Sequence, residues 1–178
     1  MKTFLREVIG TLLLAVAIFL LIQTTIQYSV VVYSSMEPNL HEGQWLVINK
    51  LVYKLHAPDR GDIIVFPNPV NPEEDYIKRV IGLPGEVVEL KNGTVYIHQP
   101  DGNVFGLDEH EYIDDPAKNS FISDTIPPDN YFVLGDNRIN SIDSRSGWTV
   151  PRQEIIGKAW ISFWPLADFG LAPNYSLP

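Results

Sequence analysis

The sequence predicts a mostly β domain preceded by a single N-terminal transmembrane helix. The first observation is an almost uninterrupted apolar run over residues 8–22. The second is the pattern beyond Tyr28, where short apolar runs alternate with proline, glycine, asparagine and aspartate. The third is the content of 14 prolines, which disfavours a helical bundle. A chain of 178 residues has room for one ordinary domain and a short appendage.

The N-terminal apolar segment is long enough to cross a bilayer. Residues 8–27 supply the roughly 20 residues that a spanning helix needs. Lys2 and Arg6 precede the segment, and no comparably close basic pair follows it before Lys50. The positive-inside rule therefore predicts a cytoplasmic N-terminus, with the rest of the chain on the outer side.

A cleaved signal peptide is the alternative, because it also combines a basic start with an apolar stretch. The segment ends in glutamine, threonine, isoleucine and tyrosine, however, and lacks a small-x-small cleavage site. A buried core helix is disfavoured because residues 12–21 are apolar on every helix face. We therefore interpret residues 1–28 as cytoplasmic N-terminus and membrane anchor, and residues 29–178 as an extracytoplasmic domain.

Several short segments beyond the anchor have the apolar and β-branched content of strands bounded by turn residues. No internal repeat interrupts this pattern. The predicted strands cover residues 28–33, 45–48, 62–66, 76–81, 87–90, 95–98, 131–134 and 158–163.

The stretch between Gly85 and Asp129 is more polar and acidic than the rest of the domain. Within it, Lys-Asn-Gly at residues 91–93 is a hairpin turn signal between two predicted strands. We therefore expect residues 86–128 to form an inserted β lobe and long loop outside the main barrel.

The composition argues against several classes of function. Lys and Arg total 13 against 22 Asp and Glu, a formal charge of -9, and no dense basic stretch exists. Nucleic acid is therefore not an expected partner. The chain has no cysteine, which excludes disulfides, thiolate nucleophiles and cysteine-based metal sites. We predict no metal site and no cofactor.

A pair of serines stands where a predicted strand meets a turn. Ser34 and Ser35 follow the strand, and Pro38 breaks it. A serine at such a junction is exposed and rigidly held, as a nucleophile must be. Serine-rich turns before proline are also common in proteins without catalytic function, so this block alone leaves both interpretations open.

A lysine lies within an apolar strand. Side chains alternate along a strand, so Lys78 is expected to face the same way as Tyr76 and Val80. The side chains expected to face the other way are Ile77, Arg79 and Ile81. An ammonium group pressed against apolar neighbours loses hydration, which lowers its pKa and favours a neutral amine that can accept a proton. The alternative is a lysine whose tip reaches solvent past those neighbours.

A polar loop carries two Asp-x-Arg pairs. Asp136 precedes Arg138 in the first pair. Asp143 and Arg145 repeat the spacing, and each pair can form charge-assisted hydrogen bonds that stiffen a loop beside a site. The segment could equally be a surface turn. Residues 60–66 are typical of a turn into a buried strand, and we interpret them as structural.

Taken together and in this order, the blocks resemble the bacterial type I signal peptidase family, also called leader peptidases, which are Ser/Lys dyad serine proteases. The motifs are Ser-Met-x-Pro, Gly-Asp-x-x-x-Phe, Tyr-Ile-Lys-Arg-Val-Ile-Gly-Leu-Pro-Gly and Gly-Asp-Asn-Arg-x-Asn-Ser-x-Asp-Ser-Arg, and the match covers nearly the whole chain. The resemblance implies a membrane-bound endopeptidase that cleaves N-terminal signal peptides from exported preproteins. It also implies a β barrel or folded β sheet with a small inserted β lobe.

By this resemblance Ser35 is the nucleophile and Lys78 the general base of an acyl-enzyme mechanism. The hydroxyl of Ser141 is implied to orient the lysine amine, while Asp143 and Arg145 brace the loop. The implied location is the cell membrane, with a single pass and an extracytoplasmic catalytic domain.

The implied partners are the signal peptides of preproteins exported by the Sec and Tat routes, and the lipid bilayer. Signal peptides present small residues just before the cut and two positions earlier, in an extended conformation. The peptide is expected to add as a strand between residues 29–34 and 75–78. The residues expected to line shallow apolar pockets are Val31, Met36, Leu40, Tyr76 and Ile77.

The sequence departs from the family pattern at two positions. Tyr33 stands where some members have a serine that helps to hold the oxyanion and others have glycine. The backbone N–H of Ser35 is the expected donor, and a second donor, from Tyr33 or Ser34, stays open. Ile139 interrupts the loop motif where an acidic residue is frequent, so one supporting contact is expected to be missing.

Three other functions compete with this interpretation. A Ser/His enzyme would use one of four histidines, His41, His56, His98 or His110, but the lysine motif argues against it. A self-cleaving repressor would need a DNA-binding domain in place of the anchor. A non-catalytic anchored β domain leaves the serine and lysine motifs unexplained.

An aromatic cluster lies near the C-terminus. Tryptophan is typical of membrane interfaces, so we expect part of this cluster to reach the outer membrane interface beside the anchor. The alternative is a conventional core strand with one exposed aromatic. The cluster consists of Trp160, Phe163, Trp164 and Phe169.

Overall fold

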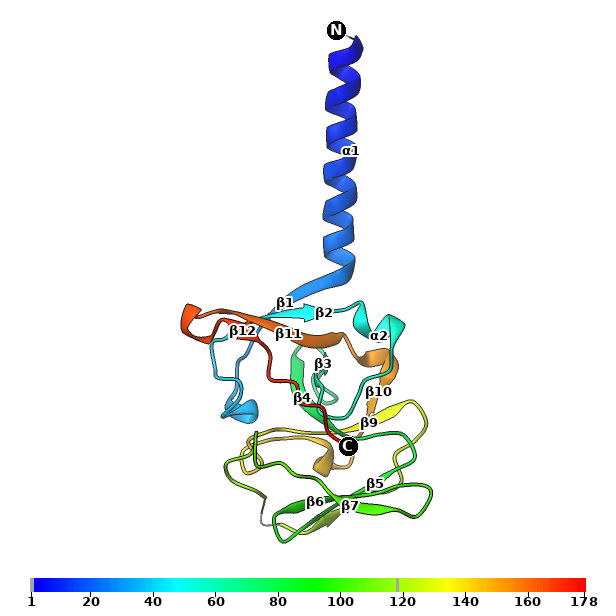
Figure 1. Cartoon of the computed structure of the whole chain (residues 1–178), viewed down its shortest axis with the longest axis vertical. Coiled ribbons are helices and arrows are strands. Elements are labelled where there is room, and N and C mark those ends of the chain that lie inside the picture. Colours follow the sequence, from blue (N-terminus) through cyan, green and yellow to red (C-terminus); the bar gives the residue numbers. More distant parts are fainter. Residues whose placement is uncertain (1, 118) are drawn as a thin grey trace.

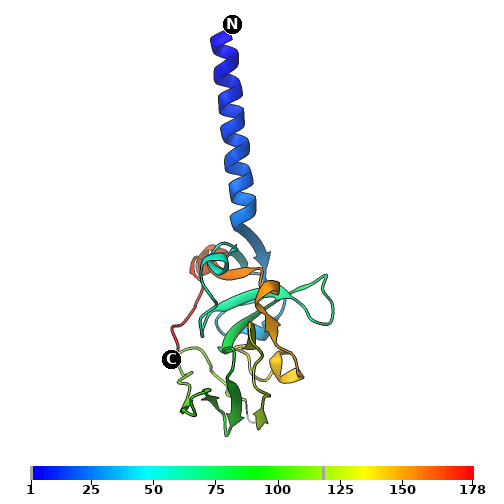
Figure 2. The same cartoon turned by 90° about the vertical axis from the view of Figure 1, so that its right-hand side faces the viewer.

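The computed structural model describes residues 2–117 and 119–178. One long helix, α1 (Lys2–Thr25), projects from a β domain (Figures 1 and 2). Residues Thr3–Thr25 are long and apolar enough to cross a membrane, and none of the best apolar window is buried within the protein. The predicted mostly β fold with one N-terminal apolar helix is therefore confirmed.

The helix ends earlier than the sequence predicts. Ile26 and Gln27, expected at the end of the anchor, belong to strand β1 (Ile26–Val30), where they pair with Asn49 and Ile48. The neighbouring strand supplies main-chain hydrogen bonds that would otherwise have to come from a further helical turn. The apolar helix α1 thus joins the domain without a linker.

The main sheet is antiparallel and contains most of the strands, in the order β1-β2-β11-β3-β4-β9-β10, with β12 paired to β11. Its strands next to α1 are β1, β2 and β11 (Figure 1). Besides β1, the members are β2 (Trp45–Asn49), β3 (Ile63–Pro67), β4 (Asp75–Gly82), β9 (Asn130–Leu134), β10 (Val150–Pro151), β11 (Gly157–Trp164) and β12 (Gly170–Leu171).

A second, four-stranded sheet lies at the end of the molecule farthest from α1 (Figure 1). Its central hairpin turns at Asn92 and Gly93, whose φ angles of 53° and 84° suit the predicted turn. Its apolar face shares one core cluster with Ile81 and Phe132 of the main sheet. The strands, in the order β7-β6-β5-β8, are β5 (Val87–Lys91), β6 (Thr94–His98), β7 (Val104–Gly106) and β8 (Phe121–Ile122).

The remaining elements are short. They are α2 (Val52–Leu55) and four 3₁₀ turns, at Ser34–Met36, Ser144–Ser146, Arg152–Glu154 and Leu166–Asp168, among the described residues. The first of these turns shortens a predicted strand: β1 ends at Val30, and the chain then turns to present Ser34 and Ser35. This turn and β4 carry the residues of the candidate site.

Candidate active site

Ser35 and Lys78 meet in the structure. Ser35 lies in the 3₁₀ turn that follows β1, and Lys78 lies in β4. The lysine Nζ donates to Ser35 Oγ at 2.7 Å and to the carbonyl oxygen of Ile77 at 2.9 Å. It also lies 4.9 Å from the ring centroid of Tyr76, the neighbour that strand alternation predicts. The hydroxyl and the amine are therefore already in hydrogen-bond contact.

Burial changes the acidity of the lysine. Lys78 is 4% exposed, and this desolvation lowers its pKa to about 8, although the carboxylates of Asp143 and Asp136 oppose the shift. Roughly one amine in ten is then neutral at pH 7. In the neutral form, the same contact lets the amine accept the proton of Ser35.

The depressed pKa of Lys78 predicts that Lys78→Met stabilises the fold at neutral pH. The unfolded lysine titrates near 10.5, so burial of the ammonium costs about 3 kcal/mol below the folded pKa of about 8. Lost hydrogen bonds offset about half of that gain, leaving about 1–2 kcal/mol. Thermal unfolding of both proteins from pH 6 to pH 10.5 measures the difference.

The pH dependence gives this prediction its control. Between pH 8 and pH 10.5 the unfolded chain binds more protons than the folded one, so wild-type stability rises with pH relative to Lys78→Met. The advantage of the variant should therefore shrink as the pH rises. A variant that is less stable at pH 7, or whose advantage grows with pH, would contradict burial of the ammonium.

The loop at residues 135–147 holds the serine turn in place. The main-chain N–H of Asn137 donates to the carbonyl oxygen of Ser35 at 3.0 Å, and its side-chain amide donates to that of Ser34 at 3.1 Å. The Asn140 amide donates to Ser34 Oγ at 3.0 Å. These contacts fix the turn that carries Ser35 against a loop from a distant part of the sequence.

Gly135 is required by the close approach of this loop to the serine turn. A Cβ atom at this position would lie 2.5 Å from the carbonyl oxygen of Ser35 and 2.3 Å from Ser141 Oγ. Gly135→Ala should therefore displace Ser35 and lower kcat by about 100-fold, the expected effect of a displacement near 1 Å. Gly170→Ala is the matched control, because nothing lies within 4 Å of a Cβ there. Wild-type turnover in Gly135→Ala would contradict the tight packing.

Asp143 and Arg145 form the ion pair that the spacing predicts. Arg145 Nε donates to Asp143 Oδ1 at 2.7 Å, and the N–H of Gly135 donates to Asp143 Oδ2 at 3.1 Å. The implied contact of Ser141 with the lysine is absent: the hydroxyl of Ser141 is buried and has no hydrogen-bond partner among the described residues. Lys78 Nζ instead uses the Ile77 carbonyl oxygen.

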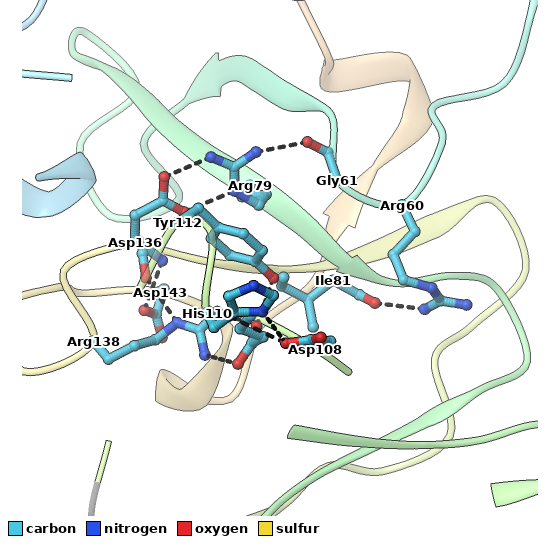
Figure 3. Close-up of polar contacts among 12 residues, drawn as sticks. Arg60, Gly61, Arg79, Ile81, Asp108, His110, Tyr112, Asp136, Arg138 and Asp143 are labelled. Atoms are coloured by element: carbon cyan, nitrogen blue, oxygen red, sulfur yellow. Dashed lines mark hydrogen bonds and ion pairs between the residues drawn. The ribbon is translucent and has the colours of Figure 1, made fainter. Parts of the chain in front are cut away.

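The other Asp-x-Arg pair, Asp136 and Arg138, does not form, and the expectation of a local pair is wrong. Asp136 accepts two hydrogen bonds from Arg79, at 2.7 and 2.8 Å (Figure 3). Arg138 pairs with Glu109, between β7 and β8, at 2.6 Å. Arg79 and Arg138 are both buried, and a buried guanidinium needs a carboxylate partner close by in the fold, whatever its distance in the sequence.

Arg79 points to the opposite face of β4 from Lys78. Its guanidinium reaches Asp136 and the carbonyl oxygen of Gly61 (Figure 3). Its central carbon lies 4.5 and 5.0 Å from the ring centroids of Tyr112 and Tyr175, which stack on each other. The side chain is completely buried. Because neighbouring residues of a strand face opposite ways, fixing Arg79 helps to direct Lys78 toward Ser35.

A cleft of about 1030 Å³ opens beside the pair. Ser35 and Lys78 contribute to its lining, together with three of the predicted pocket residues, Val31, Tyr76 and Ile77. Tyr33 and Ile139, the two positions that depart from the family pattern, lie at the same cleft, and both are exposed.

Met36 and Leu40 lie elsewhere, contrary to the expectation that they line the pockets. They are 0% and 1% exposed and belong to a core cluster with Leu46, Ile48 and Val65. The 3₁₀ turn directs Ser35 toward β4 and places Met36 beneath it. The apolar residues of this motif therefore support the turn from below.

Two free strand edges border the cleft. Asp75, Tyr76, Ile77 and Lys78 pair with β3 on one side, whereas β9 pairs β4 only from Arg79 onward. Strand β1 pairs with β2 alone. Within the part of the chain that the structure describes, the edge of β1 that faces away from β2 is therefore unpaired, and so is the edge of residues 75–78 that faces away from β3. Residues 29–35 and 74–78 both line the cleft. An extended peptide could hydrogen-bond to either edge.

No histidine among the described residues lines the cleft. His98 contacts Glu89 at 2.8 Å in the second sheet, and His41 and His56 are exposed. His110 pairs with Asp108, and this interaction raises the pKa of the exposed imidazole. The serine therefore has a lysine partner and no histidine partner.

Comparison with known proteins gives consistent matches. The profile of a family described as signal peptidase, peptidase S26, matches residues 5–164. Signal peptidase I of Leptolyngbya laminosa is 42% identical over 183 residues, covering 96% of this chain and 87% of that protein. A Synechocystis protein named probable signal peptidase I-2 is 43% identical over 144 residues, covering 78% of this chain and 63% of that protein.

The matched part thus spans less than two thirds of the Synechocystis protein. Among solved structures, a signal peptidase I from Enterococcus faecalis V583 is 35% identical, with a TM-score of 0.48. That match covers 58% of this chain and 97% of the other.

Proposed function

Because the chain belongs to the signal peptidase family, peptidase S26, we propose that it is a membrane-anchored serine endopeptidase that removes N-terminal signal peptides from exported preproteins. The observation that carries the proposal is the 2.7 Å contact between Ser35 Oγ and Lys78 Nζ. Burial that lowers the lysine pKa to about 8 supports a base operating near neutral pH.

In the proposed reaction, neutral Lys78 removes the proton of Ser35 as the serine oxygen attacks the scissile carbonyl carbon. The tetrahedral intermediate collapses, the C–N bond breaks, and the lysine ammonium returns the proton to the leaving amine. The signal peptide is then held as an ester on Ser35. Water, deprotonated by Lys78, hydrolyses this ester and restores the serine.

Ser34 is the proposed second donor to the oxyanion, beside the backbone N–H of Ser35. The Ser34 hydroxyl accepts a hydrogen bond from Asn140, so its own proton is free to be donated into the cleft that it lines. Tyr33 is 62% exposed, and its hydroxyl makes no hydrogen bond to another described residue, so it is less well held.

The substrate is proposed to add as a strand between residues 29–34 and 75–78. The apolar side chains of Val31 and Ile77 at the cleft suit the small residues that precede the cut in signal peptides. The hydrophobic part of a signal peptide lies in the membrane. We therefore propose that residues upstream of the cut run toward Ser29, the end of the cleft nearer α1.

The membrane assignment rests on α1 and on aromatic side chains of the strands beside it. The proposed topology is a single pass with a cytoplasmic N-terminus, which would place the cleft on the outer side and give it access to preproteins exported by the Sec and Tat routes. Tyr28 stacks on Trp45, with ring centroids 6.1 Å apart, on a surface suited to the bilayer interface. The exposed aromatics of this region are Tyr28, Trp45, Trp160, Trp164 and Phe169.

The function is tested by incubating the purified full-length chain with a model preprotein in detergent and mapping the cut by mass spectrometry. The proposal predicts one cut, directly after a small residue at the end of the signal peptide. No cleavage by the folded wild-type chain would favour the non-catalytic anchored domain instead.

A further inference from the structure

Basic side chains gather beside the end of the apolar helix. Lys50, Lys54 and Arg152 line a second cavity, of about 670 Å³, between α2, the turn Arg152–Glu154 and the loop before β9. The main-chain N–H of Lys50 donates to the carbonyl oxygen of Thr25, the last residue of α1, at 2.8 Å. The cavity thus begins where the helix ends, and α2 lies on that side of the domain (Figure 1).

These cations differ from most others in the domain. The remaining arginines beyond α1, and Lys158, are tied to carboxylates. Within the described part of the chain, Lys50, Lys54 and Arg152 form no ion pair. Asp129 is the one acidic residue in the described lining, so the cavity is positive in a chain whose formal charge is -9. The paired residues are Arg60, Arg79, Arg138, Arg145 and Lys158.

The guanidinium of Arg152 is held at the cavity wall. Its Nη2 donates to the carbonyl oxygens of His56 at 3.0 Å and Tyr53 at 3.3 Å. These two bonds use one nitrogen and leave Nε and Nη1 without a hydrogen-bond partner among the described residues. The ammonium groups of Lys50 and Lys54 and the free N–H groups of the Arg152 guanidinium can therefore bind a single anionic group together.

Exposed leucines flank the same basic side chains. Leu51 is 40% exposed and Leu55 is 69% exposed, at the two ends of α2. Cationic side chains beside exposed apolar ones, next to the end of a membrane helix, are the combination that contacts phospholipid headgroups and the upper acyl chains. A free phosphate ion has no apolar part that could contact Leu51 and Leu55, so the exposed leucines favour a lipid over a phosphate ion.

We propose that Lys50, Lys54 and Arg152 bind the phosphate headgroup of one anionic phospholipid in the leaflet on the side of the β domain. The inference rests on the proposed anchoring of the chain through α1. Binding would give the domain a second attachment to the bilayer besides α1. The segment Lys50–Leu55 starts next to Thr25, the end of α1, and extends from there to the lipid site. Lipid binding would thereby limit rotation of the domain about the end of α1 and keep the cleft at a set orientation to the membrane.

The test uses the full-length chain reconstituted in bilayers of phosphatidylcholine and phosphatidylglycerol. The chain is then extracted in detergent, and native mass spectrometry identifies the lipid that stays bound to it. Wild-type protein should retain one phosphatidylglycerol in preference to phosphatidylcholine. Each cation near a membrane surface contributes about fivefold to binding. Lys50→Gln with Lys54→Gln should therefore reduce retention by about 25-fold, and adding Arg152→Gln should abolish it.

Lys91→Gln is the matched control, because Lys91 is exposed in the hairpin of the second sheet, far from α1. It removes one lysine charge, as each substitution of the double variant does, and should retain the lipid. Equal retention by wild type and the double variant, equal loss in Lys91→Gln, or displacement of the lipid by inorganic phosphate would each overturn the inference.

Because the double variant alters only side chains outside the cleft, it should cleave a soluble peptide at the wild-type rate. Anchoring is scored separately, by resistance of the chain to extraction from bilayers at high salt.

Discussion

Replacing Ser35 with alanine should reduce cleavage of a preprotein by at least about 10⁴-fold and leave the fold unchanged. The substitution removes one oxygen atom from a residue that is 8% exposed, so packing is preserved while the attacking atom is lost. The main-chain contact from Asn137 to the Ser35 carbonyl oxygen does not depend on the side chain. Initial rates together with the thermal midpoint of unfolding measure both effects.

Ser34→Ala is the matched control in the same turn. It keeps the Ser35–Lys78 contact and removes the proposed oxyanion hydroxyl together with its hydrogen bond from Asn140, while the main-chain contacts of the turn remain. We therefore expect kcat to fall by about 100-fold with little change in KM. Equal losses in the two variants would indicate that any change in the turn is damaging. Substantial turnover by Ser35→Ala would assign the nucleophile to another residue.

Lys78→Arg should also abolish cleavage, with a loss of at least about 10³-fold, although the positive charge is retained. A guanidinium does not deprotonate in a protein, so it cannot take the proton of Ser35. The larger planar group must also fit where Nζ lies between Ser35 and the Ile77 carbonyl oxygen. Steady-state kinetics with the model preprotein test the loss.

Lys91→Arg makes the same change at an exposed position and should be fully active. Circular dichroism and the thermal midpoint of Lys78→Arg establish that the variant is folded. If folded Lys78→Arg kept a large fraction of wild-type turnover, Lys78 would act as a fixed charge, and the base would have to be another group near Ser35.

Strand alternation was the most informative sequence signal. It predicted that Lys78 and Tyr76 lie on one face and Arg79 on the other, and the structure places the amine over the Tyr76 ring and the guanidinium against Asp136. The hairpin at Asn92 and Gly93 was predictable for a similar reason, because only a few residue types adopt positive φ at adjacent positions.

Other features depend on partners far apart in the sequence, and no local pattern specifies them. Arg138 pairs with Glu109, which lies 29 residues away between β7 and β8, and not with its near neighbour Asp136. Strands β7, β8, β10 and β12 have only two or three residues each, which is too short to show a period of two. Their existence depends on the neighbouring strands.

The burial of Met36 could not be inferred from the family motif. A residue next to the candidate nucleophile Ser35 is a reasonable pocket residue until the 3₁₀ geometry is known. With three residues per turn, successive side chains point about 120° apart, so Met36 enters the core while Ser35 faces the cleft. The unpartnered hydroxyl of Ser141 is similar: it packs close to Gly135, and no local sequence pattern specifies which polar groups that packing brings within its reach.

The pH dependence of kcat/KM for the wild-type chain tests the Ser35–Lys78 pair most directly. The folded amine has a pKa of about 8, so the rate should rise tenfold per pH unit well below pH 8 and level off above it. A profile that levels near pH 6.5 would indicate a histidine base. A rise that continues to about pH 10.5 would mean that Lys78 is not desolvated in the working enzyme, and either result would contradict a buried lysine acting as the base.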